Sequence, residues 1–78
     1  MKQEEICVWK GRPIKIDFYK VTLSPDEVEY GAEARLEMDG FVWSGNSYDE
    51  SFNYYHSLKE DAKTLALFNL EKSIDAFA

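Results

Sequence analysis

Hydrophobic and polar residues alternate through the first part of the chain in a pattern that predicts a β-hairpin. Residues 5–9 favour β-structure, residues 10–13 favour a turn, and residues 14–18 alternate with a period of two. With residues 10–13 as the loop, Trp9 is expected opposite Ile14. One side of the hairpin would then carry five hydrophobic side chains: Cys7, Trp9, Ile14, Ile16 and Phe18.

The next segment breaks this pattern. After Phe18 the hydrophobic positions change parity, so either a bulge reverses the face of the strand or the strand is covered on both sides near its end. Residues 24–27 read Ser-Pro-Asp-Glu, a capping box with proline at the first helical position, which predicts a short helical turn. Gly31 is expected to limit this turn.

The clearest strand of the sequence is residues 32–39, in which hydrophobic and charged residues alternate without interruption. The pair Asp39-Gly40 favours a type I′ turn, so residues 41–43 are expected to return antiparallel, with Met38 opposite Phe41. Four residues of the strand should face inward: Ala32, Ala34, Leu36 and Met38. Four charged residues should face outward: Glu33, Arg35, Glu37 and Asp39.

Residues 58–77 predict a helix, because they contain neither proline nor glycine and follow a second capping box, formed by Ser57 and Glu60. One broad face of this helix is hydrophobic and is expected to lie on the sheet. Its members are Leu58, Ala62, Leu65, Ala66, Leu70, Ile74 and Phe77. Phe68 falls outside this arc and is either a core residue or an exposed anchor for a partner.

Residues 46–57, between the predicted sheet and helix, have two interpretations. Ser47 and Glu50 form a third Ser-x-x-Glu pair, which predicts a short helix from Tyr48 to about Tyr55. The alternative is a loop with buried tyrosines, since the segment is rich in both aromatic and turn-forming residues.

Together these elements predict an α+β fold, with a small antiparallel β-sheet of about four strands and one long C-terminal α-helix packed on one face. The chain has 78 residues and is expected to form a single domain, residues 1–78, since this length supports one modest core. A hydrophobic content of 45% is too high for a disordered acidic tail, although the net charge is −6.

Cysteine content and the lengths of the hydrophobic runs predict a cytoplasmic protein. Cys7 is the only cysteine, so no intramolecular disulfide can form, and the first residues lack a hydrophobic segment of the length that secretion requires. No hydrophobic run approaches the roughly 20 residues that span a bilayer, so no membrane anchor is expected.

Acidic residues are concentrated in the middle of the chain. Eight of the fifteen lie between Asp26 and Glu50, where Arg35 is the only basic residue, so eight negative charges and one positive charge give −7. This segment should repel nucleic-acid phosphates and anionic membranes. Localised charge of this kind indicates a surface that meets a partner.

Residues suited to catalysis or metal binding are few. His56 and Cys7 are the only histidine and cysteine, and no glycine-rich elbow or oxyanion motif accompanies them, so neither enzymatic activity nor a cofactor is expected. Residues 49–60 place oxygen-bearing side chains at the alternate positions of a calcium loop. However, Tyr54 stands at the sixth position, where the sharp turn requires glycine, so no metal site is predicted.

The start of the predicted helix, Lys59-Glu60-Asp61-Ala62-Lys63, resembles the last helix of double-stranded RNA-binding domains, which opens Lys-Lys-x-Ala-Lys. The resemblance implies a similar arrangement of antiparallel strands followed by a helix. Glu60 replaces a phosphate-binding lysine of that family, and the N-terminal helix with which the family contacts RNA has no counterpart in this sequence. The resemblance therefore concerns the fold and carries over no functional residue.

The acidic segment has two interpretations. Polar residues must occupy the wet face of a sheet, which alternation alone explains. Alternatively, the acidic residues form a docking surface, because mixed charges would serve solubility equally well. We hypothesise a non-catalytic acidic protein-interaction module that docks on a basic, nucleic-acid-binding surface of another protein, similar in size and charge to phage and mobile-element inhibitors and accessory proteins. The residues expected to make this contact are Glu33, Arg35, Glu37, Asp39, Trp43, Asp49, Glu50 and Tyr54.

Two other functions stay open. A structural module that pairs with a second copy, as a homodimer, would enlarge a core that is marginal at this size. A fold like that of the double-stranded RNA-binding domains would instead bind nucleic acid, which the acidic composition disfavours.

Overall fold

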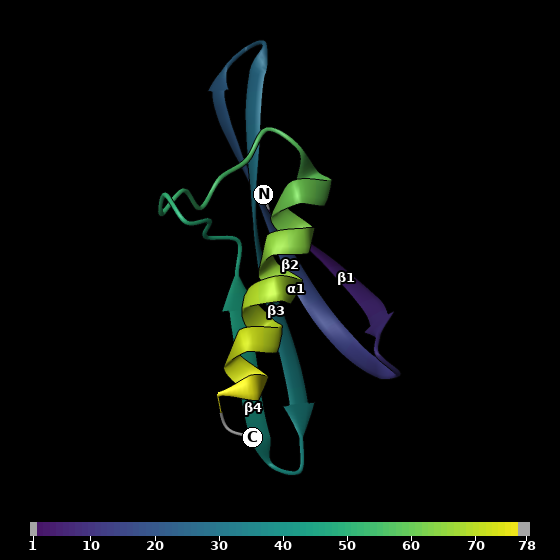
Figure 1. Ribbon diagram of the computed structural model, residues 1–78. Coiled ribbons are helices and arrows are strands. Elements are labelled where there is room, and N and C mark those ends of the chain that lie inside the picture. Colours follow the sequence, from purple (N-terminus) through teal and green to yellow (C-terminus); the bar gives the residue numbers. More distant parts are fainter. Residues whose placement is uncertain (1, 77–78) are drawn as a thin grey trace.

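Four antiparallel strands and one helix make up the fold. The structure is a computed structural model that describes residues 2–76. The strands β1 (Lys2–Trp9), β2 (Arg12–Ser24), β3 (Glu27–Met38) and β4 (Phe41–Asn46) form one sheet in sequence order, and α1 (Lys59–Asp75) lies across one face (Figure 1). The prediction of an α+β fold with a four-stranded antiparallel sheet and a C-terminal helix is confirmed.

The core lies between α1 and the sheet. Strand alternation points every second residue of the middle of β2 and β3 toward α1, and the residues that the helix covers there are almost completely buried. Each of these three elements contributes three residues: Ile14, Ile16 and Phe18 from β2, Ala32, Ala34 and Leu36 from β3, and Ala62, Ala66 and Leu70 from α1. Burial of these side chains is the main hydrophobic contribution to folding.

Small residues bring α1 into direct contact with the sheet. Four of the core residues are alanines, and Gly45 of β4 lies directly under the helix. A Cβ atom at Gly45 would lie 2.1 Å from the backbone N and 2.6 Å from the Cα of Leu70. The backbone of α1 therefore rests on the backbone of β4 at this point, which requires a residue without a side chain.

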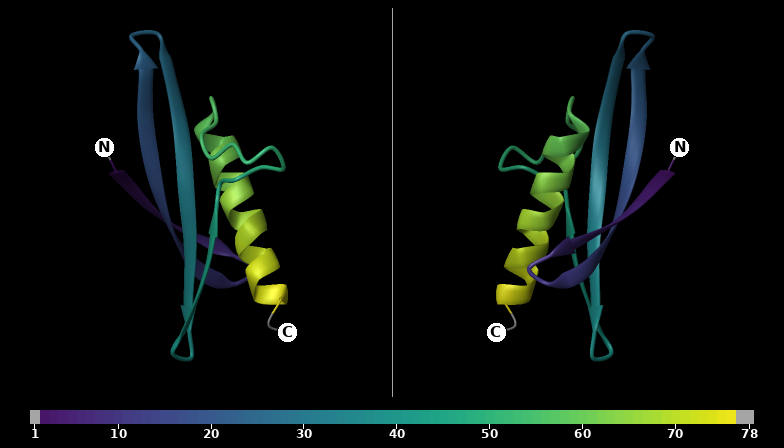
Figure 2. Two further views of the ribbon diagram at one scale, coloured as in Figure 1. Left: turned by 90° about the vertical axis from the view of Figure 1, so that its left-hand side faces the viewer. Right: turned by 90° about the vertical axis from the view of Figure 1, so that its right-hand side faces the viewer.

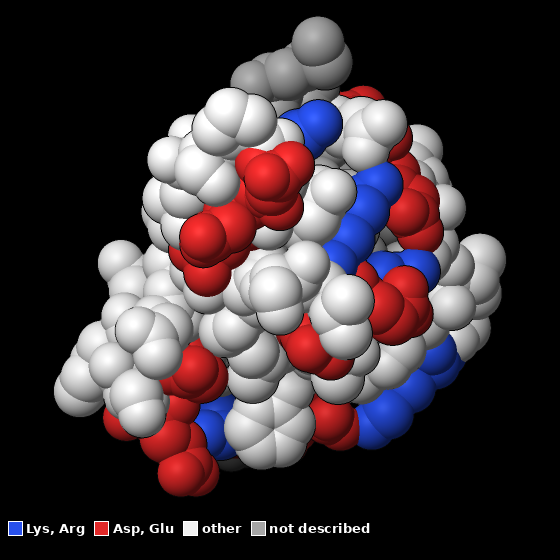
Figure 3. Space-filling view, turned by 90° about the horizontal axis from the view of Figure 1, so that it is seen from above, with Lys and Arg blue, Asp and Glu red and all other residues white. Residues whose placement is uncertain are grey.

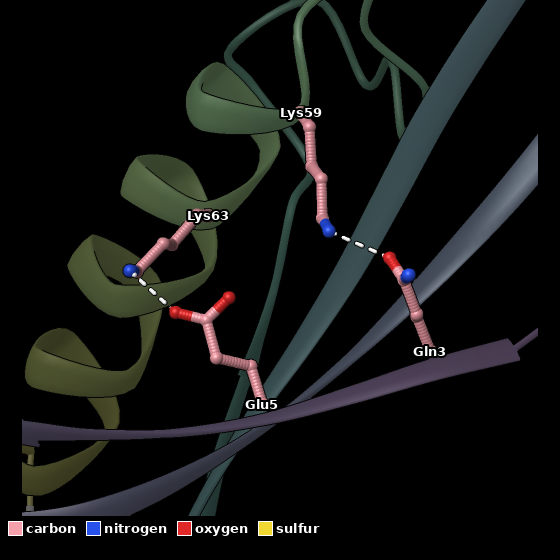
Figure 4. Close-up of polar contacts among 4 residues, drawn as sticks. All are labelled: Gln3, Glu5, Lys59 and Lys63. Atoms are coloured by element: carbon pink, nitrogen blue, oxygen red, sulfur yellow. Dashed lines mark hydrogen bonds and ion pairs between the residues drawn. The ribbon is translucent and has the colours of Figure 1, made fainter.

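Polar side chains join α1 to β1. Lys59 Nζ donates a hydrogen bond to Gln3 Oε1 at 2.6 Å, and Lys63 Nζ forms an ion pair with Glu5 Oε1 at 2.8 Å (Figure 4). The hydrogen bond to Glu5 raises the pKa of Lys63. Both lysines of the motif that resembles the RNA-binding family are thus engaged with β1 and do not extend freely into solvent.

The strands β2 and β3 extend beyond the helix as a two-stranded arm (Figure 2). Pairing of β1 with β2 reaches Tyr19, so residues 20–24 pair only with β3 among the described strands. The helical turn predicted at residues 24–27 is wrong, because Pro25 and Asp26 form the tight turn at the tip of the arm. Proline and aspartate favour β-turns as well as helix starts, and strand pairing on both sides decides between the two.

The first hairpin is tighter than predicted. Trp9 pairs with Arg12, and Lys10 and Gly11 form a two-residue turn in which both φ angles are positive, at 50° and 77°. The predicted four-residue loop and the pairing of Trp9 with Ile14 are therefore wrong by two residues. A shift of two keeps every side chain on its own face, so the five hydrophobic residues predicted on one side do lie on the side of α1.

The second hairpin agrees with the prediction. Asp39 and Gly40 form its turn with φ angles of 53° and 81°, and Met38 pairs with Phe41. The alternation of β3 also holds, with its hydrophobic residues toward α1 and its charged residues on the opposite face.

The buried face of the helix is narrower than predicted. Leu58 is the N-cap residue and no side-chain hydrogen bond caps the helix, so the predicted capping box of Ser57 and Glu60 is wrong. Leu58 is 60% exposed and Phe68 is 53% exposed, so neither is a core residue. Phe77, predicted to continue the hydrophobic face, lies outside the described residues.

Gly45→Ala is expected to lower the free energy of unfolding by about 2–3 kcal/mol, because the new methyl group would collide with backbone atoms of α1 that cannot move independently. Equilibrium unfolding in guanidinium chloride, followed by circular dichroism, measures this change. The matched control is Ser44→Ala, since the Ser44 side chain is exposed, and it should stay within about 0.5 kcal/mol of the parent. Equal stability of the Gly45→Ala variant and the parent would show that α1 does not rest on β4.

Candidate protein-binding site

The face of the sheet opposite α1, called the open face below, carries rows of like charge. The strand registers place Glu4, Asp17 and Glu33 side by side in one row and Lys15 beside Arg35 in the next. Ion pairs join the rows diagonally: Lys15 Nζ lies 3.3 Å from Glu4 Oε2, and Arg35 Nη2 lies 3.8 Å from Asp17 Oδ2. The repulsion between like charges that stand opposite each other is thereby partly compensated.

The open face is therefore not uniformly acidic. Arg35 is half-buried and engaged with Asp17. Glu33 and Glu37, on either side of Arg35 along β3, are exposed, and neither forms an ion pair with a side chain of residues 3–76. At the end of the molecule that is seen from above, acidic side chains likewise form several separate groups with basic side chains among them (Figure 3). The negative surplus of the open face thus lies on β3.

Ser47 fixes the start of the loop that follows β4. Its side chain is fully buried, and its Oγ accepts a hydrogen bond from Ala32 N–H at 2.9 Å and donates one to the Tyr54 carbonyl at 2.6 Å. The backbone N–H of Ser47 also donates to the Ala32 carbonyl at 3.0 Å. The hydroxyl thus satisfies a backbone group at the edge of β3 and holds Tyr54 beside it.

His56 closes the same loop on β3. Its backbone N–H donates to the Tyr30 carbonyl at 2.8 Å, and Tyr30 N–H donates to the His56 carbonyl at 2.7 Å. The ring Nε2 lies 2.7 Å from the Ser47 carbonyl oxygen. Since a carbonyl oxygen only accepts, Nε2 carries a proton and donates it to this bond. The imidazole is therefore part of the loop closure.

A compact turn forms the tip of the loop. The Asp49 carboxylate accepts hydrogen bonds from the backbone N–H groups of Ser51 and Asn53 at 2.8 and 3.0 Å. The bond from Asn53 is the main reason that the pKa of Asp49 is lowered. Phe52 projects from the tip, with a φ of 62° and a side chain that is 83% exposed.

The short helix predicted from Tyr48 to about Tyr55 is wrong, and the alternative of a loop is confirmed. Ser47 cannot cap a helix here, because its hydroxyl is committed to Ala32 and Tyr54. The predicted burial of the loop's three tyrosines is wrong, because Tyr54 is half-buried and the other two are exposed.

Four tyrosines gather on the open face. Tyr54 covers Gly31 of β3, because a Cβ atom at Gly31 would lie 2.2 Å from Tyr54 Cε1. The Tyr54 ring centroid lies 6.5 Å from that of Tyr19, 5.2 Å from that of Tyr48 and 4.9 Å from that of Tyr55. These rings come from β2 and from both ends of the loop.

A shallow groove of about 440 Å³ lies among these rings, and Glu33 is the only charged residue that lines it among the side chains of residues 3–76. The lining residues, which define the tyrosine groove, are Tyr19, Glu33, Tyr48, Tyr54 and Tyr55. Burial, and then the nearby Glu33 carboxylate, raise the pKa of Tyr54. The Tyr54 phenol is therefore neutral at pH 7, and Glu33 supplies the charge of the groove.

Tyr19 explains the change of hydrophobic parity after Phe18. The register of β2 with β3 stays regular until an irregularity between Thr22 and Ser24, so no bulge reverses the strand at Tyr19. Phe18 faces α1, and Tyr19 faces the loop. The strand is covered on both sides at Phe18 and Tyr19, but nearer its end Leu23 is 55% exposed, so the prediction of a strand covered on both sides near its end is wrong. Sequence reasoning missed Tyr19 as a site residue, although this parity change was the available signal.

A second groove, of about 530 Å³, lies between the loop and α1. Asn69 joins the two sides, since its Nδ2 donates to the Asn46 carbonyl at 2.7 Å and to the Tyr48 carbonyl at 2.9 Å. The exposed ring of Phe68 lines this groove, with Lys72 Nζ 4.7 Å from the ring centroid.

The eight residues predicted to contact a partner do not form one surface. Two line the tyrosine groove: Glu33 and Tyr54. Two line the groove beside α1: Asp49 and Glu50. Two lie further along the open face: Arg35 and Glu37. The last two are separate from these, with Asp39 in the turn and Trp43 half-buried against the core on the α1 side.

No match to the chain is found among protein-family models, curated proteins or solved structures. Within residues 2–76, no group of three or more His, Cys, Asp and Glu side chains is placed to hold a metal ion. The same part of the chain contains no helix that is long and apolar enough to cross a membrane. The tyrosine groove and the exposed acidic residues of β3 are therefore the features from which a function is inferred.

Ser47→Ala is expected to lower the free energy of unfolding by about 1–3 kcal/mol, because it leaves the Ala32 N–H and the Tyr54 carbonyl without their partner. Hydrogen exchange at the Ala32 amide should become faster, which NMR measures residue by residue. Ser51→Ala is the control, since the Ser51 side chain is exposed at the loop tip. Unchanged exchange at Ala32 would contradict the role assigned to Ser47.

Acid is expected to open the tip of the loop. The pKa of Asp49 is lowered in the folded protein from its ordinary value of 3.8, so the stabilisation by its charged form is fully present above pH 3.8. It is lost as the pH falls through the lowered folded pKa. The amide signals of Ser51 and Asn53 should therefore shift with a midpoint below pH 3.8, and Asp49→Asn should remove this transition. A midpoint above pH 3.8 would contradict this account.

Proposed function

We propose that this protein is a non-catalytic binding module that docks on a basic surface of another protein. The observation that carries the proposal is the tyrosine groove, where four tyrosine rings are exposed or half-buried beside the carboxylate of Glu33. Aromatic side chains are common anchors of protein interfaces, and a carboxylate among them favours a basic partner.

The loop that carries three of these tyrosines is held in place by the rest of the fold. Ser47 and His56 bond it to β3 near its two ends, and Asn69 of α1 bonds to the Tyr48 carbonyl. A tyrosine has few rotatable bonds, so ordering it on binding loses little entropy, and a loop that is already ordered loses less. This preorganisation supports a binding role for the groove.

The distribution of charge supports a basic partner. The chain carries a net charge of −6, and Glu33 and Glu37 present exposed carboxylates on β3. This negative charge attracts a basic protein over a long range, which steers association, and it repels nucleic acid. Ion pairs compensate the charges of Arg35 and Lys15 in the middle of the open face. Contact is therefore expected at the groove and along β3, and not over the whole face.

The proposed partner is a cytoplasmic protein that itself binds nucleic acid, because such proteins carry the basic surfaces that an acidic module can occupy. A cytoplasmic setting agrees with a chain whose single cysteine forms no intramolecular disulfide. Inhibitors and accessory proteins of phages and mobile elements have this size and charge, which is an analogy at the level of a class.

Self-association is a second candidate, which the edge strand β1 favours. Ile6 and Val8 of β1 are 68% and 77% exposed. An edge strand offers unpaired backbone groups to a strand of another molecule. Pairing of β1 with β1 of a second copy would continue the sheet beside these two side chains. A monomer in sedimentation equilibrium at micromolar concentration would remove this candidate.

Neutralising Glu33 and Glu37 is expected to weaken docking without changing the fold. The double variant Glu33→Gln, Glu37→Gln should slow association about tenfold at low salt and flatten its salt dependence, since both carboxylates are exposed. The partner is obtained by affinity capture from the source organism at low salt, and its association rate with each variant is then measured by stopped-flow fluorescence.

The control is the double variant Glu60→Gln, Asp61→Asn, which removes the same charge from the first turn of α1. It should leave the association rate within about twofold of the parent. Equal slowing by both double variants would mean that net charge alone governs binding. An unchanged rate and salt dependence for the Glu33, Glu37 variant would overturn the proposed docking.

A further inference from the structure

We infer that the tyrosine groove receives the side chain of an arginine from the docking partner. The inference rests on the proposed function, because the arginine belongs to the partner's basic surface. The groove combines tyrosine rings, on which a flat guanidinium can stack, with the Glu33 carboxylate, which can accept two of its hydrogen bonds.

The charge of the groove selects a cation. Among the side chains of residues 3–76, Glu33 is its only charged lining residue, and the Tyr54 phenol beside it, whose pKa is raised further above 7 by burial, is neutral at pH 7. An anion would be repelled by the carboxylate. An uncharged apolar group would displace water from the carboxylate without replacing its hydrogen bonds. A cation is attracted both by the carboxylate and by the faces of the rings.

Three other rings of the chain already have a cation. Three lysine Nζ atoms lie 4.5 to 4.9 Å from ring centroids: Lys10 over Trp9, Lys59 over Phe18 and Lys72 over Phe68. Among the side chains of residues 3–76, no lysine or arginine lies in this way over the four tyrosines of the groove. Arg35, two positions from Glu33, is engaged with Asp17. The groove is thus an aromatic surface that is open to a cation from another molecule.

Arginine fits this groove better than lysine. Its guanidinium is planar and weakly hydrated, stacks on aromatic rings and pairs with a carboxylate through two hydrogen bonds. The ammonium group of lysine is compact and strongly hydrated, so it loses more hydration free energy than a guanidinium when it leaves water. Tyr48 and Tyr55 stand at 64° and 83° to the Tyr54 ring, so the groove contains ring faces in more than one orientation, and the electron-rich face of a ring is where a guanidinium stacks.

The test titrates the whole protein with Nα-acetyl-arginine amide and with the uncharged isostere Nα-acetyl-citrulline amide, and follows the tyrosine ring signals by NMR. The arginine probe should bind with a Kd of about 1–10 mM and shift the four groove tyrosines, and the citrulline probe should bind at least about tenfold more weakly. Nα-acetyl-lysine amide should bind several-fold more weakly than the arginine probe. Equal binding of the citrulline probe, or tighter binding of the lysine probe, would overturn the inference.

Matched variants locate the binding. Glu33→Gln should weaken the arginine probe about tenfold, whereas Glu27→Gln, which removes an exposed carboxylate of the same strand outside the groove, should change its affinity less than about twofold. Tyr55→Leu, which keeps a large apolar side chain at an exposed position, should also weaken binding about threefold or more through loss of the ring. Equal effects of the two glutamate variants would place the arginine elsewhere and overturn the inference.

The probe titration needs no partner, so its failure is distinct from failure of the proposed docking. If the arginine probe binds in the groove while the Glu33, Glu37 double variant docks as fast as the parent, the cation site stands and the proposed docking fails. If the double variant loses docking while the arginine probe gives no saturable shift in the groove up to about 50 mM, docking stands and the inferred arginine site is overturned.

Discussion

The close approach of α1 to β4 is the constraint on which the rest of the structure depends. At Gly45 the backbones of strand and helix meet, so that a single methyl group would reach the backbone N of Leu70. A helix this close to the sheet brings Asn69 within hydrogen-bond distance of the carbonyls of Asn46 and Tyr48. The same packing that forms the core therefore fixes where β4 ends and how the next loop begins.

The loop that follows β4 forms hydrogen bonds with the part of the β3 edge that β4 does not cover. The buried hydroxyl of Ser47 and the backbone of His56 supply the partners that a further strand would otherwise supply. Tyr54 is thereby brought over Gly31, where any side chain would meet its ring. Two glycines thus have parallel roles, since Gly45 admits a helix backbone on one face and Gly31 admits an aromatic ring on the other.

Neighbouring strands also decide what the charges of β3 can do. Alternation places Glu33, Arg35 and Glu37 on one face, but Asp17 of β2 engages the arginine and leaves the two carboxylates exposed. One of these carboxylates borders the tyrosine groove. The acidic composition of the segment therefore becomes a local feature, an aromatic groove with one negative charge, at the place where we propose that a basic partner docks.

Local patterns in the sequence determined the elements, because side-chain period and turn geometry act over neighbouring residues; residues 32–39 and the pair Asp39-Gly40 specified their hairpin and its register correctly. The helix starts predicted from Ser-x-x-Glu pairs were wrong, because such a pair also describes only neighbouring residues. The pair at Ser47 has the local sequence of a helix start, but its hydroxyl found partners on a distant strand. Nothing local joins Tyr19 of β2 to Tyr54 of the loop. Sequence alone thus determined the order of strands and helix, the second hairpin and the total charge. Which tyrosines and acids meet was decided by the tertiary structure, because the packing of α1 on the sheet sets contacts between residues far apart in the chain.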